Sequence, residues 1–300
     1  MHFVPRLVTI FVTTARSGTQ WIAQSIKQSY PNSAVVNHEP IGYEYRPRKF
    51  IRAYGQTEEL RAIPAVGNHV REIAAIGENK VYVEVGFPSA ATVPLFHQLY
   101  GNRLKIVQLV RNPIYASASM VTHGWYSETE RTDLREGILL LPTDIGAFQK
   151  HYAQRWSSLS RYEKCLFYWT EIHMYGIEMQ WHYNNVPFLR VRFEDLISSP
   201  EHHLKELVEF VGLPFLPELK QLTSQLTDGY RFQTEHKIEW QRINDHPLTV
   251  ALAQYFGYNL GTDDITFGSR YYRPRRTLKH ITSHLVDRFR AKLKARSNDR

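Results

Sequence analysis

The stretch "LVTIFVTTARSGTQWIAQSIKQS", residues 7–29, decides the fold. Its first six residues form an apolar, β-branched run, and residues 22–29 have the apolar spacing of a helix. Residues 13–21 between them are mostly small or hydroxyl-bearing and include one arginine. A buried strand, a tight loop and a helix in this order are typical of the start of an α/β domain.

The composition of this loop favours an anionic ligand. A glycine at a helix N-terminus, here Gly18, lets several backbone N–H groups converge on an anion. Arg16 adds a cation, and Ser17 and Thr19 add hydroxyl donors. The GK[ST] ending, which reaches terminal phosphates and holds Mg²⁺ in common phosphate loops, is missing. We therefore expect an anion site that requires no metal. A plain strand–helix turn of small residues is the alternative.

Strand and helix patterns alternate along most of the chain. This alternation predicts an α/β three-layer sandwich, in which helices flank a central, mostly parallel sheet with a P-loop-like nucleotide-binding core. The predicted strands cover residues 6–12, 33–37, 80–86, 103–110 and 186–193, and the predicted helices cover 19–30, 88–101, 113–122, 199–213 and, as two helices, 145–185.

A second loop carries the same chemistry. "RNPIYASAS", residues 111–119, follows the strand predicted over 103–110. Its Arg111 ends that strand, and Ser119 lies two turns into the next helix, so the two can hold one phosphate from two sides. Ligands of parallel sheets bind at the carboxyl ends of the strands. Two anion sites at one edge predict a ligand with two phosphate-like ends.

Composition sets the outer limits. The chain has 300 residues, and its single cysteine, Cys165, excludes an internal disulfide and a cysteine-based zinc cluster. No apolar run approaches the roughly 18 residues of a membrane span. The first apolar run leads straight into the loop, so we interpret it as a core strand and expect a cytoplasmic protein.

The net charge of +8 is concentrated at the C-terminal end. Residues 270–300 hold eleven Lys and Arg against two Asp, whereas residues 1–269 hold 26 basic and 27 acidic residues. Apolar residues spaced by three and four predict a basic amphipathic helix in an extension over 261–300, after a single domain over 1–260. Such a helix fits an anionic membrane surface, an acidic polymer, or packing on the body.

Three ordered motifs now resemble one family, the sulfotransferases that use 3′-phosphoadenosine 5′-phosphosulfate (PAPS). "TTARSGTQW" resembles their 5′-phosphosulfate loop, "VRNPIYASAS" their 3′-phosphate motif, and "LRVRFEDLISSPEHHLKELVEFVGLP" their later strand and helix. The resemblance implies PAPS as co-substrate, with product 3′-phosphoadenosine 5′-phosphate (PAP). It assigns donor binding to Arg16, Ser17, Gly18, Thr19, Gln20, Trp21, Arg111, Ser119 and Phe193, with Trp21 and Phe193 at the adenine.

The resemblance leaves the catalytic base open. Phenol and steroid sulfotransferases use a histidine where this chain has Gly86, so it is more similar to carbohydrate and bacterial-type members. Carbohydrate sulfotransferases use a glutamate after the first helix, which "VVNHEP" supplies as Glu39, with His38 beside it. Glu84 in "VYVEVG" is the second candidate. The predicted catalytic set is Glu39, Arg16, Glu84 and His38, without a metal.

The acceptor is encoded less clearly. A glutamate base favours a carbohydrate or another aliphatic alcohol, and the basic tail fits a lipid-linked or membrane-proximal glycan. The aromatic residues Tyr43, Tyr45, His123, Trp125 and Tyr126 are candidates for the acceptor cleft or for the core.

Two other function classes stay open at this stage. One is a nucleotide or small-molecule kinase of related fold, which the missing GK[ST] disfavours. The other is a non-catalytic protein that keeps the nucleotide pocket and binds glycan or membrane through its tail. No feature indicates a specific nucleic-acid partner.

Overall fold

The computed structural model describes residues 5–128, 130–219 and 238–261. Its five described strands form one sheet, all parallel, in the order β2-β3-β1-β4-β5. The predicted α/β fold is therefore confirmed, and each of the five predicted strands is present. They are β1 (Leu7–Thr13), β2 (Ala34–His38), β3 (Val81–Val85), β4 (Leu104–Val110) and β5 (Phe188–Arg192).

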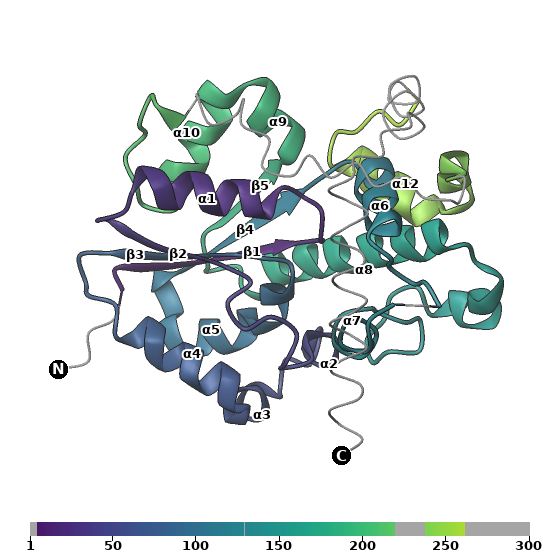
Figure 1. Ribbon diagram of the computed structural model, residues 1–300, viewed down its shortest axis with the longest axis horizontal. Coiled ribbons are helices and arrows are strands. Elements are labelled where there is room, and N and C mark those ends of the chain that lie inside the picture. Colours follow the sequence, from purple (N-terminus) through teal and green to yellow (C-terminus); the bar gives the residue numbers. More distant parts are fainter. Residues whose placement is uncertain (1–4, 129, 220–237, 262–300) are drawn as a thin grey trace, which may run out of the picture.

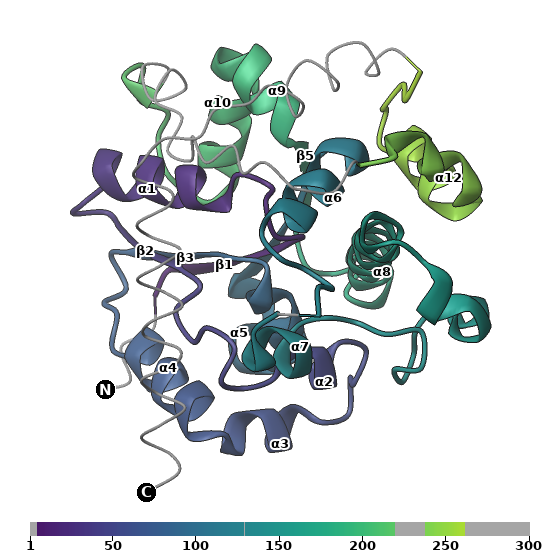
Figure 2. The same cartoon turned by 45° about the vertical axis from the view of Figure 1, so that its right-hand side comes forward.

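Helices cover both faces of the sheet (Figures 1 and 2). One face packs against α1, α9 and α10, through strand residues such as Phe11 and Leu109. The other packs against α4, α5 and α8, through residues such as Ile10 and Tyr82. The helices are α1 (Thr19–Ser29), α2 (Pro47–Phe50), α3 (Thr57–Ala62), α4 (Pro64–Ala74), α5 (Val93–Tyr100), α6 (Pro113–Thr122), α7 (Thr132–Gly137), α8 (Arg161–His182), α9 (Phe193–Ser198), α10 (Pro200–Phe210) and α12 (Pro247–Tyr255).

Local sequence explains the main elements. Alternate residues of β1 enter the two faces, and Val8, Ile10, Phe11 and Val12 are all fully buried, as expected for the central strand of a covered parallel sheet. Helix α8 begins at a capping box, in which Ser160 and Glu163 satisfy each other's backbone N–H groups.

Several boundaries differ from the predictions. Phe193, predicted to end a strand, is the first residue of α9. The region 145–185 contains a 3₁₀ helix, Lys150–Ser158, before α8, so only its second predicted helix is α-helical. Helices α2 to α4, within residues 47–74, were not predicted; α2 and α3 are too short to show a helical period, whereas α4 buries Val66, Val70 and Ile73 on one face and carries a helical signal that was missed in the sequence.

Two further predictions concern the C-terminal end and the membrane. The predicted basic helix, together with almost all of the extension over 261–300, lies outside the described residues, so its packing is untested. Among the helices that the structure describes, none has both the length and the apolarity needed to span a bilayer.

Candidate active site

The parallel sheet brings five distant segments to one edge. The strand ends lead directly into Glu39 after β2, Gly86 after β3, Arg16 after β1, Arg111 after β4 and Phe193 after β5. Because all strands run the same way, these residues follow one another along the carboxyl edge in the order of the strands. The predicted base, the two predicted anion loops and the predicted adenine contact therefore share one side of the sheet.

The first loop is a tight turn that leads into helix α1. Arg16 and Gly18 both have positive φ, 66° and 85°, and Gly18 precedes the first residue of α1. Thr14 Oγ1 lies 3.0 Å from Ser17 Oγ, which fixes the fully buried Ser17 within the turn. A non-glycine residue with positive φ costs about 1–3 kcal/mol and is typical of functional sites. The predicted Gln20 is exposed on the first turn of α1.

Two hydrogen bonds join this loop to the second one. Arg111 Nη1 donates to the carbonyl oxygen of Arg16, and Arg16 Nε donates to Ser119 Oγ over 3.2 Å. Ser119 was predicted to act together with Arg111, but the structure pairs it with the other arginine. The two guanidinium groups belong to one hydrogen-bonded unit, which gives this edge two fixed cations.

Two aromatic rings pack beside this pair of arginines, near the end of β5: Phe193 contacts Arg111, and Trp21 contacts Phe193. The guanidinium carbon of Arg111 lies 5.1 Å from the centre of the Phe193 ring, and Trp21 meets the same ring edge-on at 6.2 Å. A Cβ at Gly18 would come within 2.0 Å of the Phe193 ring, so this position needs glycine for space as well as for its φ. Trp21, predicted to contact adenine, is only 7% exposed.

The carboxylate of Glu39 lies beside the first loop. His38 Nε2 is 3.6 Å from Glu39 Oε1 and 3.1 Å from Thr19 Oγ1, so the histidine stands between the carboxylate and the loop. Burial raises the pKa of Glu39 to about 7, against the lowering effect of Arg16. Burial lowers the pKa of His38. Glu39 also has a positive φ, 51°. This carboxyl group therefore titrates near neutral pH, as a general base should.

Glu84 occupies a different environment. Its side chain is 1% exposed, and its Oε2 lies 2.7 Å from His69 Nε2 and accepts a 2.7 Å hydrogen bond from Tyr82. The same face of β3 packs against α4 and α5, away from α1. These contacts occupy the carboxylate within the protein, which suits a structural role better than proton transfer.

A pocket of about 530 Å³ adjoins Glu39. Its wall combines Tyr43 with charged residues, among which Arg46 pairs with Glu136 at 3.1 Å. Tyr45 and Trp125, which were candidates for either the acceptor cleft or the core, lie in the core, where they are 2% and 4% exposed. The lining consists of Glu39, Ile41, Gly42, Tyr43, Glu44, Arg46, Arg131, Thr132, Asp133, Glu136 and Gly137.

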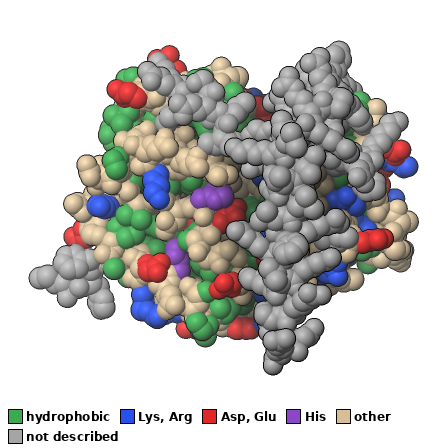
Figure 3. Space-filling view, in the orientation of Figure 1, with side chains coloured by type: hydrophobic (Ala, Val, Ile, Leu, Met, Phe, Trp, Pro, Cys, Tyr) green, Lys and Arg blue, Asp and Glu red, His purple; other side chains and the backbone are tan. Residues whose placement is uncertain are grey.

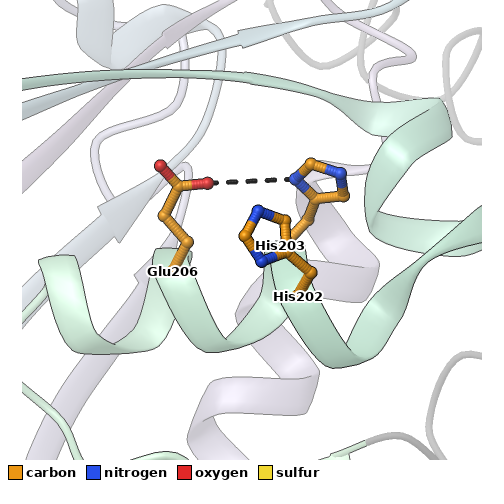
Figure 4. Close-up of side chains that lie close together, drawn as sticks. All are labelled: His202, His203 and Glu206. Atoms are coloured by element: carbon orange, nitrogen blue, oxygen red, sulfur yellow. Dashed lines mark ion pairs between the residues drawn. The ribbon is translucent and has the colours of Figure 1, made fainter.

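The molecular surface and one side-chain cluster add little to this site. On the face shown in Figure 3, acidic and basic side chains are interspersed outside the grey region. Within the described ranges, one group of three metal-type ligands comes together, His202, His203 and Glu206 on α10 (Figure 4). Its donor atoms lie within 4.8 Å of one another, all three side chains come from one helix, and His203 Nδ1 lies 3.8 Å from Glu206 Oε2. We assign it no role.

Comparison with protein families decides the affiliation of the chain. Residues 8–239 match the model of the sulfotransferase domain, which spans all five strands and both anion loops. The chain belongs to the sulfotransferase family. Comparison with curated proteins gives no match.

Several solved sulfotransferases are similar to this family member at low identity. The sulfotransferase domain of the Synechococcus PCC 7002 olefin synthase is 16% identical, with a TM-score of 0.48, over 86% of this chain and 97% of that one. The sulfotransferase from Alicyclobacillus acidocaldarius is 14% identical, with a TM-score of 0.48, over 86% and 98%. Mouse sulfotransferase SULT7A1, complexed with PAP, is 15% identical, with a TM-score of 0.42, over 79% and 69%.

Glu39→Gln should stabilise this sulfotransferase at pH 8 and not at pH 4. Because the pKa of Glu39 is raised from 4.5 to about 7 in the folded state, the folded protein loses stability as the pH rises between these two values. Glutamine carries no ionisable proton there, so the variant does not lose this stability. We expect a gain on the order of 2 kcal/mol at pH 8, measured by thermal or urea unfolding at both pH values.

The matched control is Glu84→Gln. It should cost about 1–3 kcal/mol at pH 8, because it disturbs buried hydrogen bonds to His69 and Tyr82. Equal destabilisation by both variants would contradict the electrostatic description of Glu39.

Proposed function

We propose that this sulfotransferase transfers the sulfuryl group of PAPS to the hydroxyl group of a carbohydrate or another aliphatic alcohol, with Glu39 as general base. The observation that carries the proposal is the edge where a half-buried carboxylate of raised pKa lies near Arg16, which is hydrogen-bonded to Arg111, and lines an open pocket. Membership of the sulfotransferase family supports the reaction class, and the family generally uses PAPS.

The chemistry of the donor set fits PAPS. Residues 13–19 contain hydroxyl groups, a cation and no carboxylate, and Arg111 adds a second cation through its bond to the Arg16 carbonyl. We assign the 5′-phosphosulfate to Arg16, Ser17, Gly18 and Thr19, and the 3′-phosphate to Arg111 and Ser119. The rings of Phe193 and Trp21 stand next to Arg111, where an adenine ring would stack.

Each site residue then has a defined task. Sulfuryl transfer requires the acceptor oxygen to lose its proton during in-line attack, while fixed cations neutralise charge on the leaving phosphate. PAPS, when bound, supplies the sulfuryl group. Glu39 takes the hydroxyl proton on a carboxylate oxygen, and Arg16 and Arg111 supply the cations. His38 holds the Glu39 carboxylate and the Thr19 hydroxyl in position through its Nε2 atom.

The pocket beside Glu39 supports a polar acceptor. Eight of its eleven lining residues are charged or carry a hydroxyl group, and its volume suits a small sugar unit. Carboxylate and guanidinium groups can bind the several hydroxyls of a sugar, whereas a flat phenolic acceptor would prefer apolar walls. The basic residues of 270–300 would bring the enzyme to an anionic membrane or polymer near a lipid-linked acceptor.

Arg111→Ala should weaken PAP binding about 10- to 100-fold, because the arginine is proposed to bind the phosphate that AMP lacks. The loss for AMP should be much smaller. Isothermal titration with PAP, AMP and ATP·Mg²⁺ measures these affinities and separates a sulfotransferase from a kinase. Arg103→Ala, an exposed change at the start of β4, is the control. Equal losses for PAP and AMP would remove the proposed role.

Glu39→Gln should lower sulfuryl transfer about 10²- to 10⁴-fold, the range of a positioned general base, while PAP affinity is kept. The wild-type rate should rise with pH through about 7, since the base must be ionised. Transfer of labelled sulfate from PAPS to a panel of glycans, alcohols and phenols measures this. Near-normal turnover of Glu39→Gln, with none in Glu84→Gln, would move the base to Glu84.

Deletion of residues 270–300 should leave PAP affinity unchanged, since every proposed donor contact lies between residues 16 and 193. Sedimentation with phosphatidylserine vesicles should show binding of the full chain and none of the shortened one. A fall in melting temperature without any change in vesicle binding would favour a packed helix over a targeting element.

A further inference from the structure

Gly86 lies beside the proposed base. Its backbone conformation does not explain why this residue is a glycine. It directly follows β3, whose last residue, Val85, pairs with His38 at the end of β2. Its φ is outside the positive region, so an alanine or a larger residue would meet no backbone strain there. Something other than conformation therefore favours glycine at this position.

The neighbouring atoms provide the reason. A Cβ built on Gly86 would lie 2.7 Å from Glu39 Cγ, 3.0 Å from the Glu39 amide nitrogen and 3.2 Å from its Cα. Two of these three atoms belong to the backbone and cannot move by a simple side-chain rotation. Glu39 itself has a φ of 51°, a conformation that non-glycine residues rarely adopt.

We propose that Gly86 is a positioning residue of the active site: it leaves free the volume in which Glu39 sits, so that a side chain at position 86 and a functional carboxylate at position 39 exclude each other. This rests on the proposed function for the role of Glu39. It goes beyond that function because the residue after β3 would determine which strand end can supply the base: a glycine there leaves room for a glutamate after β2.

The burial of Glu39 supplies an observable that needs no acceptor. Burial raises the pKa of this carboxyl group to about 7, so its displacement toward solvent should lower the pKa. A side chain at position 86 acts directly on Glu39 and on neither arginine of the donor site. Loss of positioning should therefore appear in the titration of Glu39 and leave PAP binding unchanged.

The test compares Gly86→Ala with Gly55→Ala. Gly55 is exposed, has no positive φ and would place a Cβ in open space, so it controls for the chemical change alone. Glutamate labelled with ¹³C at the carboxyl carbon is titrated by NMR, and the signal missing from Glu39→Gln assigns residue 39. We expect Gly86→Ala to lower the pKa of Glu39 by about one unit or more, to keep PAP affinity, and to lower transfer about 10²-fold, as a displacement near 1 Å does.

A double-mutant cycle keeps the proposal testable if Gly86→Ala is poorly stable. Glu39→Gly removes the shortest contact, to Cγ, and leaves a residue that tolerates a changed backbone at this positive φ, so the loss in melting temperature caused by Gly86→Ala should be clearly smaller in the Glu39→Gly background. An unchanged Glu39 pKa, a parallel loss of PAP affinity, or an equal loss in both backgrounds would overturn the proposal. Full turnover of Glu39→Gln would instead contradict the proposed function and leave the Gly86 contact standing.

Discussion

The all-parallel pairing of five strands, with β1 in the middle, is the constraint on which the site depends. It sends every strand end to the same edge and fixes their order, so that Glu39, Gly86, Arg16, Arg111 and Phe193 succeed one another. In this order a carboxylate stands at one end, two cations in the middle and an aromatic ring at the other. An extended ligand with two anionic groups and an aromatic base matches that sequence of chemistries.

Electrostatics at this edge balances two opposed demands. In the proposed mechanism Arg16 neutralises charge on the leaving phosphate, yet the same charge lowers the pKa of Glu39. Burial of the carboxyl group has the larger effect and raises its pKa from 4.5 to about 7. The positive φ angles of Arg16 and Glu39 indicate that folding energy is spent on holding both groups where they are. Stability and function therefore conflict at these two residues.

The sequence allowed the five strands and the positions of the two loops after β1 and β4 to be predicted, because β-branched runs and a glycine before a helix are local signals. The pocket wall could not be predicted from the sequence, because Arg46 and Arg131 are far apart in the chain and lie beside short helices that show no clear period. The bond from Arg16 to Ser119 depends on tertiary geometry that no spacing encodes. Glu84 was the second candidate for the base in the sequence, and its buried contacts to His69 and Tyr82 now set it apart from Glu39.

The position of the proposed base after β2 has a consequence for acceptor choice. The segment 39–46 carries Glu39 and also three pocket-lining residues with functional side chains, Tyr43, Glu44 and Arg46. A base on β3 would be independent of this wall, whereas here one short segment sets both the proton acceptor and the surface that orients the acceptor hydroxyl. Any change that moves the segment must alter kcat and KM together. If Glu39 is the base, as proposed, acceptor specificity is tied to the placement of that base, and the placement depends on the space that Gly86 leaves open after β3.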